Sequence, residues 1–185
     1  MSNYDLENDR DFGHFSVGRG TYWGPSAEFR TYTPSEKVEI GRYCSIAARA
    51  VICSGGQHHL DTVSTWPFEN FLDGRENPTR TYRPVANTVV GSDVWIGFGA
   101  FIGGSARIGS GAVIGASAIV MKDVPPYAIV AGNPGRILRF RFEPAIVEAL
   151  LKIQWWNWPA DLISARREDF YKPIGQFVDL YEPRS

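Results

Sequence analysis

The chain has 185 residues, of which 44% are hydrophobic and 21% charged, and its formal net charge is −1. This composition is typical of one globular domain, and it excludes long-range disorder and bulk electrostatic attraction to nucleic acid or to an anionic membrane. No apolar run reaches the roughly 18–20 residues that a membrane span requires. The two cysteines do not make a disulfide framework, and the acidic residues 1–10 are unlike a signal peptide. We therefore expect a reducing, cytoplasmic location.

Blocks of six residues that begin with an aliphatic side chain recur along the chain. A partial block starts at Val17, and we predict that residues 1–35 form either an N-terminal arm or a first partial coil. Two blocks follow, IGRYCS from Ile40 and IAARAV from Ile46. Cys44 occupies the fifth place of its block, where later blocks hold small side chains, so we predict that it has a packing role.

Residues 53–88 contain no such block. They carry histidines, prolines and a run of charged residues instead. A departure of this length from a repeat array predicts an excursion loop, and such insertions are commonly functional.

The main array starts at Val90 and reads VGSDVW, IGFGAF, IGGSAR, IGSGAV, IGASAI and VMKDVP. A period of six matches neither a helix, which repeats near 3.6 residues, nor a simple strand, which repeats at two. It fits a short strand followed by a turn, with three strands making one triangular coil of eighteen residues. The sequence therefore predicts an all-β solenoid over residues 36–135, in which the aliphatic side chains stack from coil to coil.

Residues 136–185 are predicted to form a C-terminal helical extension. Glu143 and Pro144 suit a helix start, and a second helical stretch is expected near residues 160–171. The cluster Trp155, Trp156 and Trp158 is predicted to pack against the solenoid or against a neighbouring subunit.

The array and its ending, KDVPPYAIVAGNPGRILR, resemble the hexapeptide-repeat acyltransferases. The segment GGQHHLDTVSTWPF resembles the histidine segment of their xenobiotic acetyltransferase branch, which includes chloramphenicol and streptogramin acetyltransferases and related sugar O-acetyltransferases. The matching positions are His58, Asp61, Ser64, Thr65, Pro67 and Phe68. One departure is Thr62, which stands where the branch usually has tryptophan. The resemblance implies a left-handed parallel β-helix, an acetyl-CoA donor, and a homotrimer whose active sites lie between subunits.

Transfer of an acyl group from a thioester to a hydroxyl needs a base, and histidine suits this role because its pKa lies near neutral pH. The resemblance assigns His58 as this base, with His59 as the alternative, whereas His14 lies outside the motif. Asp61 is predicted to orient the His58 imidazole or to bind the acceptor, although a backbone carbonyl would orient the ring equally well.

The resemblance also implies residues that bind the two substrates. Lysine and arginine side chains would contact the phosphates of coenzyme A, and apolar side chains would line its pantetheine arm. The predicted donor-binding residues are Phe98, Ala116, Met121, Lys122, Arg136 and Arg139. The predicted acceptor-binding residues are His59, Trp66 and Trp95, of which Trp95 is equally suited to a subunit contact.

We predict an acetyl-CoA-dependent O-acetyltransferase that acts on a small hydroxylated acceptor, either a sugar or an antibiotic, without a metal. A sugar N-acetyltransferase and a non-catalytic β-helix trimer are the alternatives. The spacing of the three histidines disfavours a zinc site of the γ-class carbonic anhydrase type. A Cys53 nucleophile is disfavoured because a coenzyme A thioester is already activated.

Overall fold

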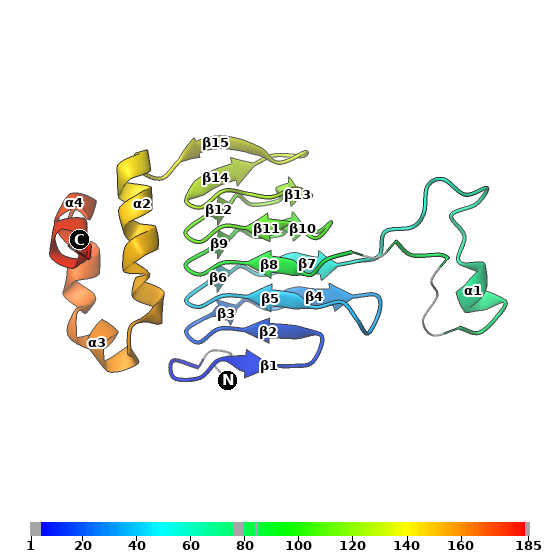
Figure 1. The fold of residues 1–185 in the computed structure, drawn as a ribbon, viewed down its shortest axis with the longest axis horizontal. Helices are drawn as coiled ribbons and strands as arrows, with labels where there is room; N and C mark the ends of the chain where they lie inside the picture. Colours follow the sequence, from blue (N-terminus) through cyan, green and yellow to red (C-terminus); the bar gives the residue numbers. More distant parts are fainter. Residues whose placement is uncertain (1–4, 76–79, 84, 184–185) are drawn as a thin grey trace.

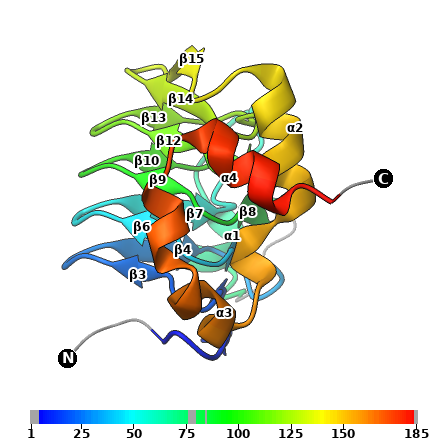
Figure 2. The ribbon, with the colours of Figure 1, turned by 90° about the vertical axis from the view of Figure 1, so that its left-hand side faces the viewer.

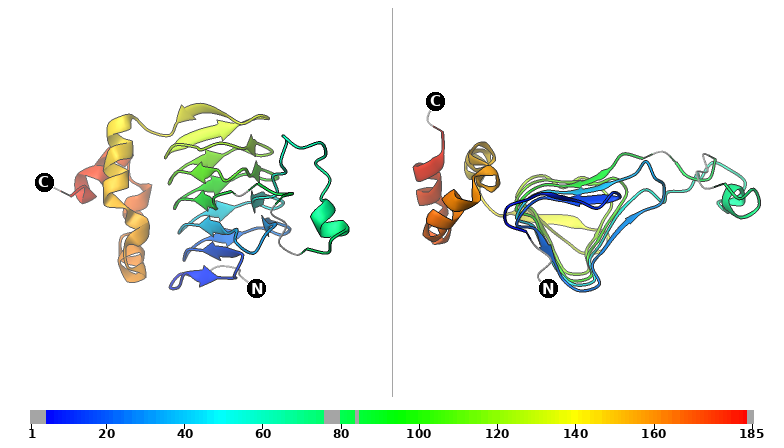
Figure 3. Two further views of the ribbon diagram at one scale, coloured as in Figure 1. Left: turned by 45° about the vertical axis from the view of Figure 1, so that its right-hand side comes forward. Right: turned by 90° about the horizontal axis from the view of Figure 1, so that it is seen from below.

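The computed structural model describes residues 5–75, 80–83 and 85–183. Short strands are stacked into a column, with a group of helices on one side and a long loop on the other (Figure 1). Viewed along the column, the coils superimpose as a triangle (Figure 3). Each side of the triangle is one sheet.

Within each coil, consecutive strands belong to sheets A, B and C in turn. Sheet A contains β1 (Arg10–Asp11), β2 (Phe15–Val17), β5 (Val38–Ile40), β8 (Thr88–Val90) and β11 (Arg107–Ile108). Sheet B contains β3 (Tyr22–Trp23), β6 (Ser45–Ile46), β9 (Trp95–Ile96), β12 (Val113–Ile114), β14 (Ala128–Ala131) and β15 (Arg136–Phe140). Sheet C contains β4 (Glu28–Thr31), β7 (Val51–Ser54), β10 (Phe101–Ile102) and β13 (Ile119–Val120).

The strand register confirms the predicted coil of eighteen residues. Ile108 is the parallel partner of Val90, and Ile114 is the partner of Ile96. These first positions of the hexads point into one continuous core, where Ile96 and Ile114 are fully buried. Consecutive coils therefore bury their aliphatic side chains directly on one another.

The small fifth residues of the hexads lie in the same core. Ala100, Ala112 and Ala118 have no exposed surface, and Cys44 is equally buried. Burial raises the pKa of the Cys44 thiol to about 12, so the side chain stays protonated. The predicted packing role of Cys44 is confirmed.

The N-terminal strands complete the lower end of the column. β2, β3 and β4 pair in parallel with β5, β6 and β7, so residues 15–31 trace a coil of the same kind. Phe15, Trp23 and Phe29 come one from each of these strands, and their rings meet at centroid distances of 4.7 to 6.3 Å. β1 pairs with β2 in the antiparallel sense.

The C-terminal segment begins with a strand, which the prediction of a helical extension from residue 136 missed. β15 pairs antiparallel with β14, because β14 offers the last open edge of sheet B. The helical elements follow: α2 (Pro144–Ile153), η1 (Trp155–Asn157), α3 (Ala160–Ala165), η2 (Arg167–Tyr171) and α4 (Ile174–Tyr181). The helix start at Pro144 and the helical stretch near residues 160–171 agree with the sequence prediction.

The helices pack on one side of the column (Figure 2) around a second core that contains Leu150 and Phe177. Trp156 is buried, and the Trp158 ring stacks on Phe177 at a centroid distance of 6.1 Å. The tryptophan cluster therefore has a packing role. Within the described part of the chain, no helix is long and apolar enough to cross a membrane.

The excursion loop leaves the column at the corner that follows β7 and returns at β8. It spans residues 55–87, slightly less than the predicted 53–88, because β4 offers partners for the whole of β7 as far as Ser54. The described residues of the loop include one short helix, α1 (Phe68–Phe71), and the loop projects away from the column on the side opposite the C-terminal helices (Figures 1 and 3).

Candidate functional site

His58 lies where the two ends of the excursion loop run side by side. The backbone N–H of Arg83 donates to the Gln57 carbonyl at 2.8 Å, and His59 N–H donates to the Thr81 carbonyl at 3.2 Å. Between these bonds His58 and Tyr82 form an antiparallel β-bridge. The backbone of His58 is thus held by a short two-stranded ladder.

The imidazole of His58 is held in one orientation. Its Nδ1 atom lies 2.5 Å from the Thr65 carbonyl oxygen, and its ring meets the Tyr82 ring edge-on at a centroid distance of 4.9 Å. Because a carbonyl oxygen only accepts hydrogen bonds, Nδ1 must carry the proton. The neutral ring then presents an unprotonated Nε2, which is the atom a general base needs.

The predicted contact of Asp61 with His58 is not formed, and an acceptor-binding role for Asp61 stays a prediction. The Asp61 carboxylate lies 3.5 Å from Nδ1 of His59, and 85% of its side chain is exposed. The loop turns between His59 and Asp61 so that the neighbouring imidazole is the one within reach. The backbone carbonyl of Thr65 orients His58 instead, which is the alternative that the sequence left open.

The segment after Asp61 is a compact, exposed turn. Thr62 donates its hydroxyl to the Ser64 carbonyl at 3.0 Å, and the Ser64 hydroxyl accepts the Trp66 N–H at 3.1 Å. The Trp66 ring meets Phe68 edge-on at 4.6 Å and remains partly exposed. Trp66 is therefore available to a ligand, but its acceptor-binding role stays a prediction.

Two of the predicted donor-binding residues lie at the same corner as the loop. Met121 and Lys122 follow β13 directly and are exposed. A methyl group added at Gly104 would lie 3.2 Å from the terminal carbon of Met121 and 3.3 Å from Nε2 of Gln57. The side chains of Met121 and Gln57, the residue before His58, therefore both lie beside Gly104.

Phe98 and Ala116 lie at a different corner, between sheets B and C. Ser117 N–H donates to the Phe98 carbonyl at 2.8 Å, so the two turns stack directly. The Phe98 ring is half exposed, with the Arg49 guanidinium 5.9 Å from its centroid. One chain therefore does not bring these residues to His58.

The remaining predicted residues lie on sheet B. Arg136 and Arg139 belong to the exposed strand β15, and each guanidinium donates to a nearby carbonyl, that of Gly135 at 3.0 Å or Phe140 at 3.1 Å. Trp95 in β9 is 58% exposed on the outer face of the sheet.

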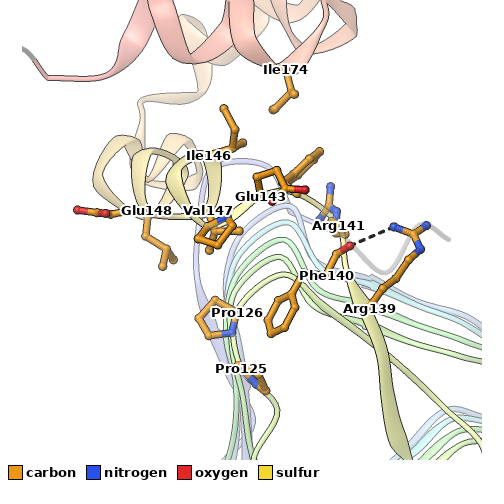
Figure 4. A pocket seen from close by; sticks show the side chains of 13 residues that line it. Pro125, Pro126, Arg139, Phe140, Arg141, Glu143, Ile146, Val147, Glu148 and Ile174 are labelled. Carbon is orange, nitrogen blue, oxygen red and sulfur yellow. Dashed lines mark hydrogen bonds between the residues drawn. The ribbon is translucent and has the colours of Figure 1, made fainter.

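Arg139 also borders an apolar groove of about 1010 Å³ between α2 and the upper end of the column (Figure 4). Its walls include Pro126, Phe140 and Val147. α2, whose residues form one wall of the groove, lies on the side of the column opposite the excursion loop that carries His58 (Figure 3).

Cys53 does not have the environment of a nucleophile. It lies in β7, where it is 5% exposed, and burial raises the pKa of its thiol. A reactive cysteine needs a lowered pKa and access to substrate.

The sequence does not identify Tyr82 as a contact of His58, and it leaves open which backbone carbonyl orients the ring. Tyr82 lies among arginines near the return of the loop, and no spacing rule connects it to the histidines. The role of Thr65 belongs to its backbone, so the residue type carries no signal for it.

Comparisons with known proteins agree with this fold. The family described as "Bacterial transferase hexapeptide (six repeats)" matches residues 87–122. The polySia-specific acetyltransferase NeuO aligns with a TM-score of 0.51 and 25% identity over 83% of this chain and 63% of that chain. The N-acyltransferase AntD from Bacillus cereus aligns with a TM-score of 0.54 and 21% identity over 72% of this chain and 66% of its own, a likeness of fold alone. The chain thus spans slightly less than two thirds of these two solved chains, and the matches imply a left-handed β-helix.

Three relatives cover most of the sequence. A chloramphenicol acetyltransferase of Agrobacterium fabrum is 42% identical over 83% of this chain and 78% of its own length. A probable macrolide acetyltransferase of Lysinibacillus sphaericus is 40% identical over 80% of this chain and 86% of its own length. The virginiamycin A acetyltransferase of Staphylococcus aureus is 34% identical over 83% of this chain and 72% of its own length. The chain therefore belongs to the hexapeptide-repeat acetyltransferases, in the branch of the chloramphenicol, macrolide and virginiamycin enzymes, and it is an acyltransferase.

Proposed function

We propose that the protein transfers an acetyl group from acetyl-CoA directly to a hydroxyl of a small acceptor, an antibiotic or a sugar. The observation that carries this proposal is the contact between Nδ1 of His58 and the Thr65 carbonyl, at 2.5 Å. It leaves Nε2 as a proton acceptor on a half-buried ring at the base of the loop.

The reaction needs one base and no covalent enzyme intermediate. Nε2 of His58 takes the proton of the acceptor hydroxyl while its oxygen attacks the thioester carbonyl. The tetrahedral intermediate collapses by breaking the C–S bond, and the imidazolium returns its proton to the coenzyme A thiolate. The buried, protonated thiol of Cys53 supports transfer without an acyl-enzyme.

The donor would lie between copies of the chain. Met121 and Lys122 flank the His58 corner, whereas Phe98 and Ala116 lie at the next corner of the triangle. In a homotrimer whose columns lie parallel, the His58 corner of each chain would lie against the Phe98 and Ala116 corner of its neighbour. Arg136 and Arg139 at the upper end would then meet the phosphates of coenzyme A.

The experiment measures release of free thiol from acetyl-CoA with a panel of hydroxylated antibiotics and sugars. His58→Ala should lower turnover roughly 10²- to 10⁴-fold, the usual loss on removing a general base, with donor affinity nearly unchanged. The matched control is His14→Ala, which removes an exposed imidazole outside the motif and should keep full turnover.

Other outcomes of these assays would favour a different base or a different function. Loss of turnover in His59→Ala with full activity in His58→Ala would transfer the base role to His59. Turnover with amine acceptors alone would favour the N-acetyltransferase, and no acetyl-CoA binding would favour the scaffold.

Independence from metal is tested by dialysis against a chelator, after which turnover should persist. The cytoplasmic location stays a prediction.

A further inference from the structure

Glu69 is a buried carboxylate in a loop whose surface is otherwise largely exposed. It lies in α1, and the residue is 6% exposed. Neither the resemblance to known acetyltransferases nor the mechanism above gives it a role. A buried charge is costly unless hydrogen bonds or opposite charges compensate it.

One oxygen of the carboxylate is hydrogen-bonded by the far side of the loop, whereas the buried Oε1 atom has no hydrogen-bond partner among the described residues. Its Oε2 atom accepts the backbone N–H of Arg80 at 2.7 Å and that of Thr81 at 3.1 Å. The Arg75 guanidinium lies 3.6 Å from Oε1. Burial alone would raise the pKa of Glu69, but these hydrogen bonds and Arg75 outweigh it and lower the pKa. Glu69 is therefore ionised at neutral pH.

The two segments that Glu69 joins are the two that hold His58. On one side, the Thr65 carbonyl accepts Nδ1–H of His58, and the chain then enters α1. On the other side, Tyr82 forms the β-bridge and the ring contact with His58, directly after Thr81. The Glu69 carboxylate thus links the segment that orients the ring to the segment that holds the backbone.

We propose that Glu69 is a positioning residue that fixes the Nδ1–H tautomer of His58 by fastening α1 to residues 80–82. This inference rests on the proposed function in taking His58 as the base. Without the carboxylate, α1 and the Thr65 carbonyl lose their attachment to the segment that carries Tyr82. The imidazole then reverts to the Nε2–H tautomer that prevails for histidine in water, and Nε2 can no longer accept a proton.

The test reads the tautomer directly. Nitrogen-15 NMR of the His58 ring, at a pH where the imidazole is neutral, is recorded for the full-length wild type, Glu69→Ala and Glu69→Gln. A glutamine carbonyl can still accept the two backbone N–H groups, so Glu69→Gln should keep the Nδ1–H signature and most of the turnover. Glu69→Ala should lose the signature, and kcat should fall by about 10²-fold, as expected for a misplaced catalytic group. The KM for acetyl-CoA should stay within a few-fold in both variants.

Asp73→Ala is the matched control, since it removes an exposed carboxylate of the same loop that has no hydrogen bond or ion pair among the described residues. It should behave as the wild type. A preserved Nδ1–H signature in Glu69→Ala, an equal loss in Asp73→Ala, or no rescue by Glu69→Gln would each overturn the proposal. The tautomer is read without turnover, so this outcome is separate from the failure of the proposed function, which full activity of His58→Ala would show.

Discussion

Asp93 shows how a single corner residue responds to burial. It occupies a left-handed conformation (φ 57°) in the turn before Val94 and faces a cavity of about 540 Å³ between the column and the helices. Burial raises the pKa of its carboxyl to about 6, and the Arg141 guanidinium, 3.2 Å away, only partly offsets this. The folded protein therefore holds the Asp93 proton more tightly than the unfolded chain does.

This raised pKa predicts a pH-dependent loss of stability. Between about pH 4 and pH 6, Asp93 is ionised in the unfolded chain but still protonated in the folded protein. The free energy of unfolding therefore falls as pH rises, by about 2–3 kcal/mol in total, and is constant above about pH 6. Asp93→Asn removes the titration, and asparagine tolerates the left-handed backbone. In thermal melts from pH 4 to pH 7, the melting temperature of the variant should rise relative to the wild type. A difference that is constant with pH would contradict this account.

At the level of the strand, stability comes from the stacked aliphatic side chains. Ile102 in β10 is fully buried, whereas Ile137 in β15 is 47% exposed. Ile102→Ala leaves a cavity that the neighbouring coils cannot fill, and it should lower the free energy of unfolding by about 2–5 kcal/mol. Ile137→Ala makes the same chemical change on the surface and should cost well under 1 kcal/mol. Urea unfolding followed by circular dichroism compares the two, and equal losses would argue against a continuous core.

The regular coils were predictable from the sequence, but the departures from them were not. The first and fifth positions of each hexad point into the core, so the burial of Ile96, Cys44 and Ala100 was predicted correctly. β15 was missed because its residues carry no hexad, and only the open edge of β14 makes them a strand. The partner of Asp61 was missed because two adjacent histidines lie two and three residues before it, and only the turn of the loop brings His59 within reach.

At the scale of the whole molecule, the excursion loop leaves large apolar side chains mostly exposed. Leu60, Val63, Phe71 and Leu72 are each more than 70% exposed. Large apolar side chains that are exposed together on one loop are typical of a surface that contacts another chain. A neighbouring copy in the proposed trimer would cover them.

The double substitution Phe71→Ser with Leu72→Ser should therefore weaken assembly. Sedimentation equilibrium should give three chain masses for the wild type and a shift toward one chain mass for the variant. Turnover should fall at the protein concentrations where the trimer dissociates. Leu180→Ser, which changes an exposed leucine in α4, is the control and should leave both measurements unchanged. A wild type that sediments as a single chain would refute the trimer.

The antiparallel strands at the two ends of the column have a consequence for how a second column could stack on the first. A stack of parallel coils can in principle grow without limit, since its last coil offers the same backbone groups as the first. β1 covers the lower edge of sheet A and β15 covers the upper edge of sheet B, both with reversed chain direction. A second molecule arriving at these two edges finds no parallel strand to continue, whereas β3 and β4 at the lower end and β11 and β13 at the upper end remain the edge strands of their sheets.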